Sequence, residues 1–170
     1  WPQVLPANGS ISAWQEAVIG PEISNYRITE VLVQVGDQVR KGQVLARIAS
    51  DTVSNELAEA SAAVAELQAS AAEAKSNATR AKELKAQGFY SSQLNTQYQT
   101  AEHTAAARLA AAKARLQAAE LKMSKTRVLA PDDGVISARG ATVGSLTQAG
   151  EELFRLIRGN RLEWRAEVPS

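Results

Sequence analysis

Few side chains in this 170-residue sequence have the types and spacing that enzyme chemistry requires. Asp132 and Asp133 are adjacent, whereas the carboxylates of an acid–base pair usually face each other across a substrate. Pro131 and Gly134 flank them, which is the composition of a tight turn. His103 is the only histidine and has no second ligand at metal-binding spacing beyond its neighbour Glu102. We therefore predict no enzyme activity, no cofactor and no metal.

A second group of residues suits binding rather than catalysis. Arg80, Leu84 and Ser91 cluster around Gly88, where a long helical pattern is interrupted. An apolar residue and an arginine at an exposed helix end suit a contact with the helices of a partner. The same residues also suit simple helix termination, because cations stabilise helix C-termini and a serine can cap the next helix. The spacing alone leaves both interpretations open, and Ser91 could serve both.

The element that must position this group is a helical hairpin over residues 51–126. In its first half, apolar residues recur at alternating steps of four and three, as in the seam of a coiled coil. These residues are Val53, Leu57, Ala60, Val64, Leu67, Ala71, Ala74, Ala78 and Ala81. The seam is expected to continue at Lys85, which would leave Leu84 outside it.

The second half of the hairpin repeats the pattern with one irregularity. Two successive steps of four, at Ala101, Ala105 and Leu109, predict a local stutter. The seam residues of this half are Leu94, Tyr98, Ala101, Ala105, Leu109, Ala112, Leu116, Ala119, Met123 and Thr126. Only a short turn separates the two helices, so they must run antiparallel.

The turn of the hairpin carries its own signals. Gly88 suits the left-handed residue just past a helix end, and Ser91 or Ser92 can cap the second helix. Phe89 and Tyr90 either pack within the turn or contact a partner, and the sequence leaves that choice open.

Short β-branched segments flank the hairpin on both sides and form a repeat. A shift of 108 residues carries one flank onto the other. It superposes Val35-Gly36 on Val143-Gly144, Gly42 on Gly150, Leu45 on Leu153, Arg47 on Arg155 and Ile48 on Leu156. Since each copy is too short to bury a face alone, residues 12–50 and 127–159 should form one β domain with a pseudo-twofold axis. Residues 1–11 read as an extended lead-in, and residues 160–170 as the first strand of a further domain with nothing left to pair it.

The segments Ile28–Ala46 and Val128–Ile136, in this order around the heptads, resemble the split biotinyl/lipoyl-like domain of periplasmic adaptor proteins, also called membrane fusion proteins. The spacing of Arg80, Leu84 and Ser91 resembles the tip motif by which such adaptors dock an outer-membrane channel. Residues 162–169 resemble the start of their β-barrel domain. The resemblance covers residues 8–170. One departure is Asn25-Tyr26, where the family usually has glycine, but Asn tolerates the left-handed conformation.

The predicted fold class is α+β: an antiparallel two-helix coiled-coil hairpin inserted between the halves of a β-rich biotinyl/lipoyl-like domain, plus the first strand of a truncated β-barrel domain. The resemblance implies an adaptor that bridges a proton-driven inner-membrane pump of the resistance-nodulation-division class and an outer-membrane channel. It also implies a hexameric ring, and a periplasmic location with attachment to the inner membrane through an anchor absent from this sequence.

Composition adds limits and alternatives. The net charge of +1 predicts no general attraction to nucleic acid, and the absence of cysteine excludes disulfides and thiolate metal sites. The sequence contains no apolar run of 18 residues that could span a bilayer.

An adaptor for an ATP-driven (ABC) exporter remains an alternative function, because the tip motif is shared. A biotinyl or lipoyl carrier is a weaker one, since the long hairpin occupies the place of the acceptor lysine. A purely structural coiled-coil dimer, with the Gly88 turn opened, is a third.

Overall fold

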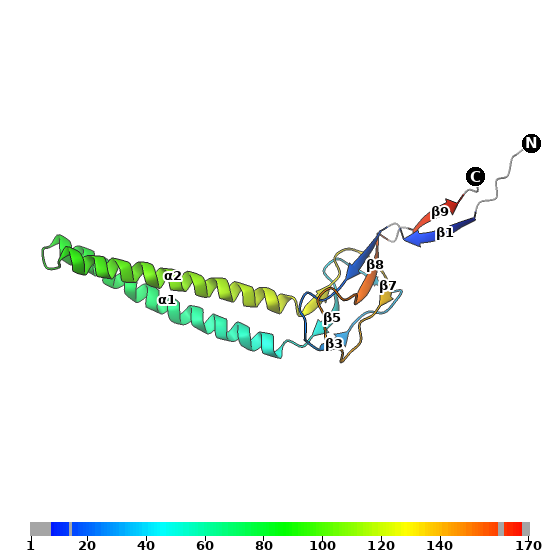
Figure 1. Ribbon diagram of the computed structural model, residues 1–170, viewed down its shortest axis with the longest axis horizontal. Coiled ribbons are helices and arrows are strands. Elements are labelled where there is room, and N and C mark those ends of the chain that lie inside the picture. The colour runs from blue at the N-terminus through cyan, green and yellow to red at the C-terminus, as the bar shows by residue number, and fades with distance from the viewer. Residues whose placement is uncertain (1–7, 14, 160–161, 168–170) are drawn as a thin grey trace, which may run out of the picture. The chain divides into compact units, whose positions relative to one another are not determined.

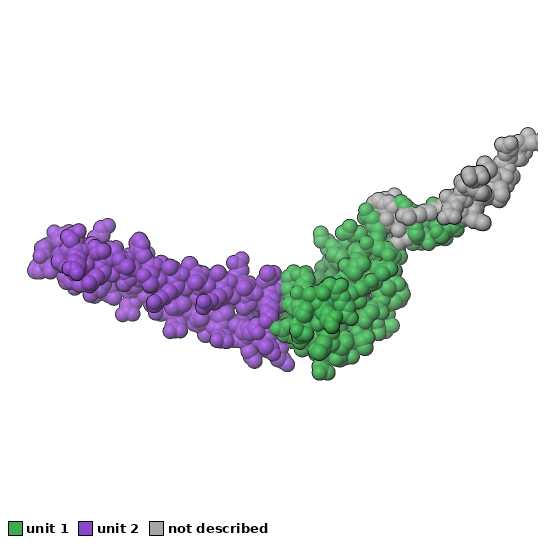
Figure 2. Space-filling model, in the orientation of Figure 1, with its two compact units in different colours: residues 1–49, 125–170 green, residues 50–124 purple. Residues whose placement is uncertain are grey.

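The computed structural model describes residues 8–13, 15–159 and 162–167. It divides into two compact units, which Figure 2 distinguishes by colour. Residues 50–124 form a helical unit, and residues 1–49 together with 125–170 form a β unit. The helical unit is therefore an insertion between two parts of the β unit, and the predicted α+β class is confirmed.

The helical unit consists of α1 (Asp51–Ala86) and α2 (Ser92–Ser124), which lie side by side and antiparallel (Figure 1). Each helix is about 50 Å long at about 1.5 Å per residue. Every seam residue predicted for α1 is buried or half-buried, so the heptad pattern of this helix is confirmed. Near the open end of the hairpin the Lys122 Nζ lies 2.7 Å from the Glu56 Oε2, which joins the two helices across one flank of the seam.

The stutter predicted in α2 lies nearer the turn than expected. Ala101 is exposed, and Glu102 takes the inward position between Tyr98 and Ala105. With Glu102 in the seam the steps alternate four and three from Tyr98 onward, and the two successive steps of four fall at Leu94, Tyr98 and Glu102 instead. The error arose from assuming an apolar residue at each inward position. Close to the turn the contact is partly polar instead, because the Gln99 Nε2 donates to the Ala78 carbonyl oxygen at 3.0 Å.

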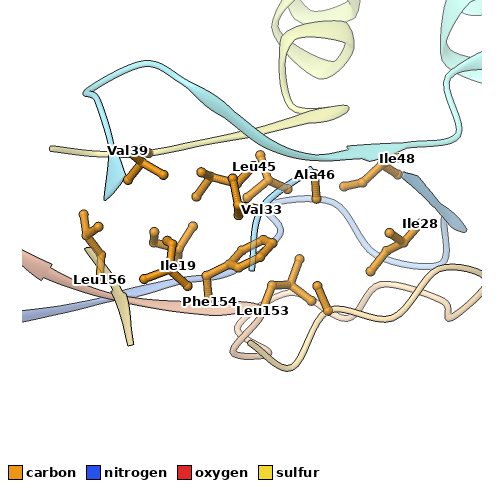
Figure 3. Close-up of a cluster of buried hydrophobic side chains, with 14 residues drawn as sticks. Ile19, Ile28, Val33, Val39, Leu45, Ala46, Ile48, Leu153, Phe154 and Leu156 are labelled. Atoms are coloured by element: carbon orange, nitrogen blue, oxygen red, sulfur yellow. The ribbon is translucent and has the colours of Figure 1, made fainter. Parts of the chain in front are cut away.

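Two small sheets make up the core of the β unit. Its strands are β2 (Glu16–Ile19), β3 (Ile28–Val31), β4 (Gln38–Val39), β5 (Val44–Ile48), β6 (Arg127–Leu129), β7 (Gly134–Arg139) and β8 (Phe154–Arg158). One sheet has the strand order β2-β8-β7-β4 and the other β3-β5-β6. Buried apolar side chains from both sheets meet between them (Figure 3).

The 108-residue repeat is visible in the pairing of the strands. The Gln38–Val135 pair corresponds to the Arg27–Leu146 bridge. More important, the halves exchange strands: β6 of the second half pairs with β5, and β2 of the first half pairs with β8. Neither half can complete its own sheet, so the predicted pseudo-twofold β domain is confirmed, and its parts must fold together.

Core positions follow the same repeat. Ile28 and Ile136 are equivalent and both fully buried. The further equivalent pairs are Val33 with Ala141, Leu45 with Leu153, Ala46 with Phe154, and Ile48 with Leu156. Ala46 in the first half is equivalent to the much larger Phe154 in the second half. The two halves therefore contribute unequal side-chain volumes to the same close-packed core.

The two segments at the ends of the described chain pair with each other. Strand β1 (Asn8–Ala13) and strand β9 (Leu162–Glu167) are antiparallel over six residue pairs. The expectation that the last strand has no partner is therefore wrong, because most of β1 lies in what was expected to be a lead-in. Neither segment has a local signal for a pairing across 149 to 159 positions. The assignment of β9 to a further barrel domain stays a prediction.

Gly134 is the position at which this β unit should tolerate substitution least. A Cβ atom there would collide with the backbone carbonyl oxygen of Ile157 on the paired strand. We expect Gly134→Ala to lower the free energy of unfolding by about 3 kcal/mol, because backbone must move to admit the methyl group. Hydrogen exchange of β5 and β8 in a urea series measures this loss.

Gly36 provides the matched control. Its φ is +95° and no atom lies within 4 Å of the added Cβ. Gly36→Ala should thus cost only about 1–2 kcal/mol of backbone strain. Equal losses for the two variants would contradict the close approach of β7 and β8.

Candidate functional site

The turn between the helices is held by backbone hydrogen bonds. The Gly88 N–H donates to the Lys85 carbonyl oxygen at 3.0 Å, and the Phe89 N–H donates to the Leu84 carbonyl oxygen at 2.8 Å. This pair of bonds is the Schellman motif, which needs a left-handed residue at its centre. Gly88 has φ +83°, so its predicted role is confirmed.

Ser91 caps the second helix. Its Oγ accepts a hydrogen bond from the Leu94 N–H at 3.1 Å, whereas Ser92 is already the first residue of α2. The sequence left open which of the two serines forms the cap, and the structure selects Ser91. Its hydroxyl group can still donate a hydrogen bond to a partner, so the capping and docking roles are compatible.

The two aromatic residues of the turn are placed differently. The rings of Tyr90 and Tyr98 stack with centroids 6.2 Å apart and an interplanar angle of 13°, so Tyr90 packs within the hairpin. Phe89 is 75% exposed. The sequence left open whether these aromatic residues pack within the turn or contact a partner. The structure packs Tyr90 within the turn and leaves Phe89 exposed.

The three predicted tip residues lie at the same end of the hairpin, in different environments. Arg80 and Ser91 are exposed, but Leu84 is half-buried. The expectation that the seam passes through Lys85 and leaves Leu84 outside is wrong, since Lys85 is the exposed residue of the two. A lysine side chain keeps its ammonium group in water, so the last inward position falls one residue earlier.

The tip is also cationic. Arg80, Lys82 and Lys85 lie within two turns of the end of α1, where Glu83 is the only carboxylate. No charged residue follows until Glu102. Within the described chain none of these four side chains takes part in an ion pair. The tip therefore offers an arginine, two lysines and a phenylalanine to solvent.

Other candidate groups have structural roles. The Asp133 Oδ1 accepts from the Lys41 N–H at 2.7 Å, and the Asp132 Oδ2 lies 3.5 Å from the Arg158 Nε. Both aspartates thus have structural partners outside residues 131–134. His103 is exposed, and no cluster of three potential metal ligands occurs among the described residues.

One charged cluster ties β2 to β8. The Arg155 guanidinium donates two hydrogen bonds of 2.9 Å to the Glu152 carboxylate, and the Glu16 Oε2 lies 3.7 Å away. The bonds and charge of Glu152, with a smaller effect of Glu16, raise the pKa of Arg155 above its ordinary value. Arginine is already charged at neutral pH, so this shift supports the sheet and indicates no catalytic role.

Comparison with known proteins connects this architecture to a family. The biotin/lipoyl family, described as biotin-requiring enzyme, matches residues 15–73. The chain is 32% identical over 149 residues to the efflux pump periplasmic linker BepD of Brucella suis biovar 1 (strain 1330). The alignment covers 86% of this chain and 37% of that protein, so the chain spans just over a third of the length of this curated relative.

Solved structures share the fold. The membrane fusion protein Spr0693 of Streptococcus pneumoniae R6 matches with a TM-score of 0.72 and 22% identity, over 95% of this chain and 67% of that one. The chain belongs to the membrane fusion proteins, the periplasmic adaptors. ZneB of Cupriavidus metallidurans matches this adaptor with a TM-score of 0.64 and 23% identity, over 93% of this chain and 66% of that one. No described helix of the adaptor is long and apolar enough to cross a membrane.

The capping role of Ser91 can be tested separately from docking. We expect Ser91→Ala to cost about 1 kcal/mol of local stability at the start of α2, because the Leu94 N–H loses its acceptor. Ser91→Asp should restore most of it, since a carboxylate also caps. Hydrogen exchange of the amides of Leu94 and Asn95 measures the effect. Ser92→Ala is the matched control, and an equal effect there would contradict the assignment of the cap.

Proposed function

We propose that this chain is part of a periplasmic adaptor that links an inner-membrane efflux pump to an outer-membrane channel, and that it docks the channel through the hairpin tip. Arg80, Leu84 and Ser91 are the proposed contact residues. The observation that carries the proposal is the state of the tip: a hydrogen-bonded turn at which Arg80 has no ion-pair partner among the described residues and Phe89 is exposed. The likeness to an efflux pump periplasmic linker supports it.

The helical unit suits a linker and offers little for catalysis. Small seam residues such as Ala78, Ala81 and Ala112 are buried between the helices, and the described helices hold no cluster of metal ligands. A pair of antiparallel helices about 50 Å long can bridge a gap of that length with few residues. Its turn is the natural contact point, because the other end is where the chain enters and leaves. We therefore propose a linker without enzyme activity.

A biotinyl or lipoyl carrier is the weaker candidate, although the family match over residues 15–73 speaks for it. A carrier needs an exposed lysine on a short turn between its half-units. Here α1 and α2 occupy that place, between β5 and β6. Intact-mass measurement of the protein from its native host decides this point, since a carrier would show a covalent biotinyl or lipoyl addition.

The wider assembly is also a proposal. We propose a proton-driven pump of the resistance-nodulation-division class, a ring of adaptor copies, and a periplasmic location with attachment to the inner membrane. An ATP-driven exporter would use the same tip motif, so the pump that copurifies with the full-length protein separates the two classes.

Substitutions at the tip test the docking proposal. We expect Arg80→Asp to abolish export, because it reverses a charge at the contact. Arg80 makes no ion pair with any described residue, so its replacement removes no salt bridge from the described hairpin. Leu84→Asp should do the same by removing an apolar contact. Export is measured in cells that lack the native copy, and circular dichroism of each purified variant checks the helices.

Arg115→Asp is the matched control for charge reversal, since Arg115 is an exposed arginine of α2 that lies away from the turn. It should leave export near the wild-type level. Normal export with Arg80→Asp would remove the docking claim.

A further inference from the structure

Phe89 is the most exposed large apolar side chain among the described residues, at 75%. Its position is fixed by the turn. Its N–H donates to the Leu84 carbonyl oxygen, the preceding Gly88 is left-handed, and the following Tyr90 is stacked on Tyr98. The backbone on both sides of Phe89 is therefore restrained. An exposed aromatic ring on a restrained backbone loses little conformational entropy when it binds, which favours tight binding.

Three cationic residues precede this ring at the end of α1. Arg80, Lys82 and Lys85 lie on the last two turns of α1, and their only acidic neighbour there is Glu83. We refer to the three cations as the tip collar. The uncharged first turns of α2 supply no counter-charge. A complementary surface therefore has an apolar centre and an acidic border.

We propose that Phe89 is the apolar anchor of the tip contact, and that it enters an apolar socket on the channel whose rim carries carboxylates facing the tip collar. This inference rests on the proposed function and adds to it a residue outside the Arg80, Leu84 and Ser91 set. It also specifies the chemistry of the partner surface. Interface hot spots are commonly single aromatic residues seated in such pockets, with charges around them that set the rate of association.

An anionic membrane is the other surface that would attract an aromatic ring among cations. The structure favours a protein socket. Binding in a bilayer interface requires a broad apolar helix face, whereas this tip exposes one large apolar side chain, and Leu84 and Tyr90 are half-buried. The charge of the collar and a single anchor suit a pocket of matching size.

The first experiment measures binding of the purified full-length protein to the purified outer-membrane channel of the same organism by surface plasmon resonance. We expect Phe89→Ala to weaken binding roughly thirty-fold, or about 2 kcal/mol, mainly through faster dissociation. Leu121→Ala is the matched control, because Leu121 is a 59% exposed apolar residue near the other end of the hairpin. It should change the affinity less than about two-fold.

The second experiment tests the collar. Lys82→Glu combined with Lys85→Glu should slow association at least about ten-fold at low salt and reduce the salt dependence of binding. Lys75→Glu combined with Lys113→Glu, at two exposed lysines farther from the turn, is the control of equal charge. Circular dichroism of every variant confirms that the helices are retained.

The outcomes separate this inference from the proposed function. Loss of binding with Arg80→Asp but normal binding with Phe89→Ala would overturn the anchor and keep the docking proposal. Normal binding with both would remove the docking proposal as well. Flotation with phosphatidylglycerol vesicles tests the anionic membrane as the alternative binding surface. If the protein bound these vesicles through Phe89 and did not bind the channel, the proposal of a protein socket would be contradicted.

Discussion

The close approach of two alanine-lined helices is the interaction on which the candidate site depends. Ala78, Ala81 and Ala112 are buried at this contact and leave room for little else. Each buried methylene-sized group contributes only about 0.8 kcal/mol, so the helix pair gains its stability from length and not from a thick core. Local hydrogen bonds then decide the geometry of the turn. The left-handed Gly88 and the Ser91 cap hold it, and they fix where the exposed side chains lie.

The β unit stays one folded body although a long helical insertion separates its two halves in the sequence. Because β2 and β6 are each paired in the sheet of the other half, the two halves cannot separate without breaking both sheets. The Ile48 N–H donates to the Thr126 carbonyl oxygen at 2.8 Å, which ties together the two points where the chain leaves and re-enters the unit. In the proposed function the β unit supports the hairpin and carries no covalent cofactor.

Much of this structure could be predicted from the sequence, because its strongest signals are periodic. The heptads of α1, the 108-residue repeat and the left-handed Asn25, with φ +68°, are local patterns that tertiary packing did not override. The failures share a cause. Heptad counting places an apolar residue at every inward position. Glu102 is nevertheless inward although it is charged, and Leu84 is half-buried because Lys85 keeps its ammonium group in water. The exposure of Phe89 depends on how the Schellman turn is oriented, which composition cannot show.

Cross-linking along the hairpin in living cells tests the central claim most directly. A photoreactive amino acid is placed one position at a time at Arg80, Phe89, Ala58 and Leu121 of the full-length protein. The account predicts cross-links to the outer-membrane channel from positions 80 and 89, and none from positions 58 and 121. Cross-links of equal yield along the whole hairpin, or only from positions 58 and 121, would contradict it.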